Sequence, residues 1–231
     1  MLKGEDELLP GRGAALARFA ATLTARPWEV TPELGASLVA HGLGPADLEA
    51  AAGIAAMFNY LTRVADASGI DFDYASPLPV FQPDKERAPI PRPPADRWPV
   101  LGAEFRTLPS FPELSEAWRS WREYVFDADE PLTRRERRVL AAAAAQECCD
   151  RWRADELAAY APRDGRESTL DAFARRLSVA PWRMSPAELR TLRDAGYPER
   201  ALLHAISVVA LQNAESRLAM GRGLIIAEPR P

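Results

Sequence analysis

The two cysteines of the chain, Cys148 and Cys149, are adjacent and end the alanine-rich stretch AAAAAQECC. Two thiols at the end of a helix could carry redox chemistry, in which a thiolate attacks a peroxide or a disulfide. Adjacent cysteines, however, can close only a strained ring that lies outside ordinary disulfide geometry. The alternative interpretation is that both are small, buried, apolar residues at a contact between helices.

Charged residues follow the two thiols. Arg151 lies about one helical turn beyond Cys148, where it could acidify the thiol or bind an anion. Asp155 comes four residues after Arg151, and this spacing is also typical of an ion pair on a helix surface. Asp155 could move protons near neutral pH only if burial raised its pKa considerably.

Composition narrows the class of protein. The 231 residues carry a net charge of −4 with both signs interspersed, so no nucleic-acid-binding surface is expected. The longest apolar runs, such as Ala201–Leu211, are too short and interrupted to cross a bilayer, and the N-terminal residues lack the apolar core of a signal peptide. Two cysteines without such a signal indicate a reducing compartment. We therefore expect a cytoplasmic protein with no membrane or nucleic-acid partner.

The chain also contains an internal repeat. Residues 16–70 and 170–224 align without a gap at a constant offset of 154. The positions that recur are Leu16, Phe19, Ala20, Leu23, Pro27, Trp28, Pro32, Leu38, Gly42, Leu48, Asn59, Arg63 and Gly69, matched by Leu170, Phe173, Ala174, Leu177, Pro181, Trp182, Pro186, Leu192, Gly196, Leu202, Asn213, Arg217 and Gly223. A period of this length predicts a duplicated unit rather than a short solenoid repeat.

Each copy is expected to form three helices. The second helix of each copy starts with an N-cap residue and a proline, Thr31–Pro32 and Ser185–Pro186. It ends at a glycine, Gly42 or Gly196, in the position that favours a left-handed backbone. The third helix is long and apolar on nearly all sides, so we predict that it is the buried central helix.

An asparagine and an arginine recur on both third helices. They are Asn59 and Arg63 in the first copy and Asn213 and Arg217 in the second. Polar side chains on an apolar helix must find hydrogen-bond partners. Their recurrence favours a structural hydrogen-bonding role over a role in binding substrate.

A proline-rich stretch, Ala75–Pro99, separates the copies and predicts an extended belt or linker. Helices are expected again at Phe111–Val125 and after Thr133, whose partner in a capping box would be Glu136. Glu136 also lies in a run of arginines, which by itself indicates a solvated helix face.

The second copy has preceding helices that the first lacks. The expected organisation is an all-α fold with a half-unit at residues 1–74, a linker at 75–100 and a complete unit at 101–231.

Several of these segments resemble the alkylhydroperoxidase D-like (carboxymuconolactone decarboxylase-like) family. They are FNYLTRVADASGI, the preceding HGLGPADLEAAAGIAA, the segment ERALLHAISVVALQNAESRLAMG, and FRTLPSFPELSEAWRSWREYVF with the following LTRRERRVLAAAAAQECC. The resemblance covers most of residues 15–74 and 105–224. It implies that family's helical bundle and a peroxidase-related, antioxidant oxidoreductase. It also implies that the first half of an N-terminal unit is missing.

The resemblance assigns roles to five residues. In the family a glutamate precedes a Cys-x-x-Cys pair, and a histidine follows; the second cysteine attacks the peroxide. Carried over by position, Glu136 matches the glutamate, Cys148 the first cysteine, Arg151 the second cysteine and Asp155 the histidine, while Cys149 is an additional thiol. The implied catalytic set is therefore Glu136, Cys148, Cys149 and Asp155, with Arg151 in substrate binding. Because the attacking thiol is replaced by an arginine, we expect a poor peroxidase or none.

Two functions from different classes remain open. The first is a divergent enzyme that has weak or altered thiol chemistry or catalyses another reaction on a small molecule. A peroxide is among its candidate substrates, and no cofactor or metal is expected. The second is a non-catalytic helical protein that keeps only the fold. In both cases a homo-oligomer is expected, because the apolar third helix of the half-unit lacks helices to cover it.

Overall fold

All regular elements of residues 11–70 and 86–226, the part of the chain that this computed structural model describes, are helical. The α-helices are α1 (Gly11–Ala25), α2 (Pro32–Ala40), α3 (Pro45–Ser68), α4 (Pro112–Asp127), α5 (Arg134–Glu147), α6 (Arg151–Glu156), α7 (Gly165–Val179), α8 (Pro186–Asp194) and α9 (Glu199–Ile226). The expected all-α fold is confirmed. None of these helices is long and apolar enough to span a membrane.

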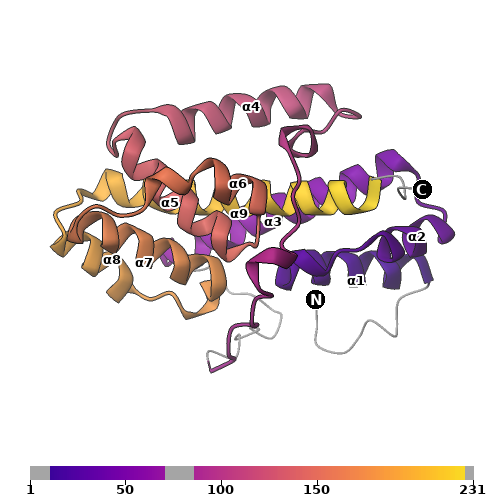
Figure 1. Cartoon of the computed structure of the whole chain (residues 1–231), viewed down its shortest axis with the longest axis horizontal. Helices are drawn as coiled ribbons and strands as arrows, with labels where there is room; N and C mark the ends of the chain where they lie inside the picture. The colour runs from indigo at the N-terminus through magenta and orange to yellow at the C-terminus, as the bar shows by residue number, and fades with distance from the viewer. Residues whose placement is uncertain (1–10, 71–85, 227–231) are drawn as a thin grey trace.

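The long helices α3 and α9 form the centre of the molecule. They pack against each other, with α4 on one side of the pair and α1, α2, α7 and α8 on the other (Figure 1). The helices come very close at Gly221, where an added Cβ would lie 2.9 Å from the Cβ of Ala52. The absence of a side chain at Gly221 is therefore what allows this approach.

The helix boundaries of the two copies correspond. α1 and α7, α2 and α8, and the starts of α3 and α9 are each 154 residues apart. The predicted caps are also present, because Thr31 accepts from the backbone N–H of Leu34, and Gly42 and Gly196 have φ of 79° and 86°. The duplication of residues 16–70 and 170–224 itself stays a prediction.

The two third helices differ in burial, and the expectation that both are buried is wrong for α3. α9 is covered by α4 and α5, and the alanine run of α5 lets that helix pack closely on both α7 and α9. No described helix covers the corresponding face of α3. Ile54 and Phe58 are consequently 60% and 62% exposed.

In the described part of the proline-rich stretch, residues 86–99, a short 3₁₀ turn at Ala95–Arg97 is the only regular element. Its earlier part lies outside the described residues. The backbone oxygen of Pro99 accepts from the N–H of Arg151, and Arg92 donates to the backbone oxygen of Gln146. This stretch thus lies against the end of α5, next to the cysteines.

Candidate functional site

The cysteines lie where α5 ends. Cys148 is the C-cap of α5, and Cys149 has a left-handed backbone with φ of 59°. The N–H of Cys149 bonds to the oxygen of Gln146, and that of Asp150 bonds to Ala145, the pattern of a Schellman motif. Cys148 therefore lies at the negative end of the dipole of a 14-residue helix, which does not favour a thiolate.

Cys148 is buried between α5 and α9. Its thiol donates to Oδ1 of Asn213 over 3.2 Å. Nη1 of Arg217 lies 3.3 Å from the same sulfur and donates to it. The thiol thus belongs to a polar cluster on α9 rather than to an open cleft.

Cys149 is buried as well and has no exposed surface. Burial, and to a smaller extent the neighbouring Cys148, raises the pKa of the Cys149 thiol to about 12. This thiol is therefore protonated near neutral pH and is a poor nucleophile.

We expect the stability of the protein to fall at alkaline pH because of Cys149. An unfolded cysteine loses its proton near pH ~9, whereas folded Cys149 keeps it until about pH 12. The protonated Cys149 thiol contributes fully to the free energy of unfolding below about pH 9. This contribution is lost as the pH rises from about 9 to about 12, at up to roughly 1.4 kcal/mol per pH unit. Urea unfolding of the wild type and Cys149→Ser from about pH 8 to pH 11 measures this slope. Parallel pH profiles for the two proteins would contradict it.

Glu136, another of the implied site residues, lies apart from the thiols. Glu136 completes the predicted capping box, since its Oε2 accepts from the N–H of Thr133 over 2.8 Å. It lies in the first turn of α5, about 18 Å along the helix from Cys148 at 1.5 Å per residue. The structure therefore does not bring Glu136 to the thiols.

Arg151 and Asp155 form an ion pair on the surface of α6. Nε of Arg151 lies 2.7 Å from Oδ2 of Asp155, whose side chain is 63% exposed. This is the surface pair that the spacing indicated. The thiols are buried whereas Arg151 and Asp155 are exposed, and the catalytic roles of the five residues stay predictions. Among the described residues no group of histidine, cysteine and carboxylate side chains could hold a metal ion.

The recurring asparagine–arginine pairs form a reciprocal set of hydrogen bonds. Asn59 donates to Oγ1 of Thr24 over 3.0 Å, within the first copy, and Arg63 donates to the backbone oxygen of Ser178, in the second, over 3.2 Å. The expected structural hydrogen bonds are present on this helix.

The second pair mirrors the first. Asn213 donates to Oγ of Ser178 over 2.8 Å, within its own copy, and Arg217 donates to the backbone oxygen of Thr24 over 3.0 Å. Each arginine thus reaches across to the other copy. The exchange brings the two guanidinium groups, far apart in sequence, to the same place.

A cavity of about 250 Å³ lies at this crossing. Its lining residues are Thr24, Ala25, Trp28, Asn59, Thr62, Arg63, Arg87, Ile90, Arg92, Glu147, Ser178, Val179, Pro181, Trp182 and Arg217. We call it the arginine pocket. Its lining holds four arginines and one carboxylate, and that carboxylate, Glu147, already pairs with Arg92 and Arg175.

Two of the four arginines in the arginine pocket have no carboxylate partner among the described residues. Neither Arg63 nor Arg217 has an ion pair with a carboxylate in the described part of the chain, and Nε of Arg63 is buried without a hydrogen-bond partner there. Arg63 is only 4% exposed. Burial, and next the charge of Arg217, lowers the pKa of Arg63 to about 9, so the group remains charged at neutral pH. An anion in the pocket would relieve both the charge repulsion and the unmet donor.

Sequence reasoning assigned the two arginines a structural role and did not find the pocket. The signal available was their recurrence on apolar helices. Arg87 and Arg92, which lie in the proline-rich stretch, gave no comparable signal.

No family model, curated protein or solved structure matches the chain. The resemblance to the alkylhydroperoxidase D-like family therefore stays a prediction.

Proposed function

We propose that the protein binds a small organic anion in the arginine pocket. The observation that carries this proposal is the pair of arginines, Arg63 and Arg217, gathered there without a carboxylate partner among the described residues. Two buried like charges are costly unless an opposite charge accompanies them. Guanidinium groups bind carboxylates and phosphates through paired hydrogen bonds, so either group would provide an acceptor for the unpartnered Nε of Arg63.

The walls of the pocket indicate what the rest of the ligand is like. The indole rings of Trp28 and Trp182 line it, together with apolar side chains such as Ile90 and Val179. The volume of about 250 Å³ limits the ligand to a small molecule. An acid with one short apolar or aromatic part fits this combination best.

Binding can be tested with benzoate and phenyl phosphate, using neutral benzamide as the uncharged comparison. By calorimetry the wild type is expected to bind at least one of the anions and not benzamide. Arg63→Met should weaken binding by about ten- to a hundredfold, because a charge-assisted hydrogen bond of roughly 1.5–3 kcal/mol is lost. Arg63→Lys keeps the charge but not the paired donors, so its affinity for the anion should lie between those of the wild type and Arg63→Met.

Arg18, an exposed arginine on α1, offers the matched control. Arg18→Met should bind like the wild type, which separates a local effect from a change in net charge. Circular dichroism and thermal unfolding verify that each variant is folded. Equal binding of benzamide, or no change in Arg63→Met, would rule out the proposed site.

The second candidate is residual thiol-dependent peroxidase activity at Cys148. This candidate is favoured by the contact between the sulfur of Cys148 and Arg217, because a neighbouring cation stabilises a thiolate. Against it, Glu136 and Asp155 lie away from the sulfur, and no resolving thiol with ordinary geometry is present in the described residues. Rapid peroxide turnover that Cys148→Ser abolishes would favour this candidate over anion binding.

A further inference from the structure

A row of large apolar side chains is exposed along α3. Ile54, Met57, Phe58 and Leu61 follow the i, i+3, i+4, i+7 spacing of one helix face. Each is at least 42% exposed. Such a row on a helix normally faces a core, so its exposure needs an explanation.

The matching face of α9 shows what such a face normally contacts. The residues at the 154-residue offset, Val208, Leu211, Gln212 and Glu215, are completely buried. Gln212 accepts a hydrogen bond from Arg153 of α6, and Glu215 pairs with Arg122 of α4 over 2.7 Å. Helices α4 to α6 therefore cover on α9 the face that is bare on α3.

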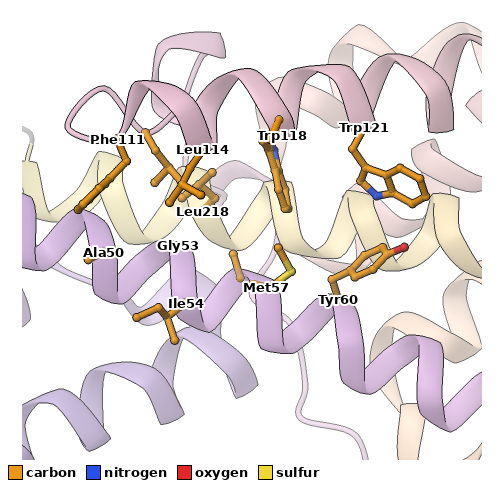
Figure 2. A pocket seen from close by; sticks show the side chains of 13 residues that line it. Ala50, Gly53, Ile54, Met57, Tyr60, Phe111, Leu114, Trp118, Trp121 and Leu218 are labelled. Atoms are coloured by element: carbon orange, nitrogen blue, oxygen red, sulfur yellow. The ribbon is translucent and has the colours of Figure 1, made fainter.

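Next to the exposed row, α3 and α4 enclose an apolar groove of about 530 Å³. Figure 2 shows Trp118, Trp121 and Leu114 of α4 facing α3 across it, with Leu218 of α9 behind. Ile54 and Met57 belong to both the exposed row and the groove lining. The apolar surface thus continues from α3 across the groove to α4.

At the far end of the groove, aromatic rings extend this surface. Tyr60 meets Trp121 edge to face, and Trp121 stacks on Tyr124, whose side chain is about half exposed. Their exposure on one continuous surface is typical of an interface.

We propose that this surface binds a second copy of the chain. The two α3 faces would meet about a twofold axis, and Phe58 of each copy would insert into the α3–α4 groove of the other. A twofold arrangement suits the surface because each copy carries both the protruding ring and the groove that receives it. The partly exposed side chains on it are Ile54, Met57, Phe58, Leu61, Leu114, Trp121 and Tyr124.

The size of the surface agrees with a stable dimer. Side chains of this size bury roughly 150–250 Å² when covered completely. Seven of them, each about half exposed, leave on the order of 500–900 Å² to be covered, a range that includes the roughly 800 Å² per partner of a standard interface. The proposal does not depend on anion binding, since the arginine pocket uses the Asn59 and Arg63 face of α3.

Sedimentation equilibrium from about 1 to 100 μM tests the proposal. The wild type is expected to form a dimer of two 25.4 kDa chains. Phe58→Glu should raise the dimer dissociation constant about a hundredfold or more, because it places a charge in the centre of the apolar contact. Since Phe58 is exposed in the single chain, circular dichroism should show Phe58→Glu folded like the wild type.

Val39→Glu is the matched control, because Val39 is similarly exposed but lies at the end of α2, away from the groove. It should leave the dissociation constant unchanged. A wild type that remains monomeric at about 100 μM, or a Phe58→Glu variant that still dimerises like the wild type, would overturn the proposal. A trimer or a ring would overturn the twofold arrangement.

Discussion

Replacing Arg137 by methionine is expected to lower the free energy of unfolding by about 3 kcal/mol. Arg137 is completely buried and donates to the backbone oxygens of Leu132, Val125 and Glu130 over 3.2, 2.8 and 2.7 Å. These bonds hold the connection between α4 and α5. Methionine fills a similar volume but donates nothing, so the carbonyl groups would lose their donor, and each unmet buried group costs about 1–3 kcal/mol.

The adjacent Arg138 provides the control for this prediction. It pairs with Asp127, whose side chain is 45% exposed, and an ion pair at such a surface contributes about 0–1 kcal/mol. Urea unfolding of the wild type, Arg137→Met and Arg138→Met should therefore show a large loss for the first variant and a small one for the second. Equal losses of stability would show that the hydrogen bonds from Arg137 to the connection between α4 and α5 do not account for its contribution to the free energy of unfolding.

The second large effect is expected at Asp150, the residue that follows the cysteines. Asp150 is buried and accepts from Nη2 of Arg106 over 2.8 Å, from Oγ of Ser216 over 2.7 Å and from the N–H of Arg153 over 3.2 Å. Asp150→Ala would leave Arg106 buried without its partner and remove the N-cap of α6. Breaking a buried ion pair in this way typically costs about 3–5 kcal/mol.

This substitution should also change the behaviour of the thiols. Asp150 anchors the turn after Cys149 to Arg106 and to α9, so its loss should increase the rate at which a thiol reagent labels the native protein. Asp155→Ala is the control, because its partner Arg151 is also on the surface; its stability should stay within about 0.5 kcal/mol of the wild type. Unchanged labelling and stability in Asp150→Ala would show that the buried pair does not hold this turn.

The sequence alone predicted most of the helices and several of their ends. The caps at Thr31, Thr133 and Ser185, and the left-handed glycines Gly42 and Gly196, are present where their residue types indicated. These signals are readable because each depends on contacts within about one helical turn. The 154-residue offset was equally visible, since it needs only a comparison of the chain with itself.

Residues that were only implied to share a site proved to be separated. Glu136 and Cys148 belong to one continuous helix, and a helix keeps residues at its two ends apart. Arg151 and Asp155 lie on the solvent side of α6. Matching by position could not determine these distances, because it does not include the direction in which each side chain points.

An all-α chain, the ends of several helices and a recurring asparagine–arginine pair on two long helices could all be predicted from local patterns. Which charges are buried could not, because burial depends on how the helices pack. Arg137 and Arg138 are neighbours in one run of arginines, yet only Arg137 points into the core. Likewise, Arg63 and Arg217 meet because α3 and α9 pack together and each arginine reaches into the other copy. Burial and convergence depend on contacts between residues far apart in the chain, and local patterns carry no information about such contacts.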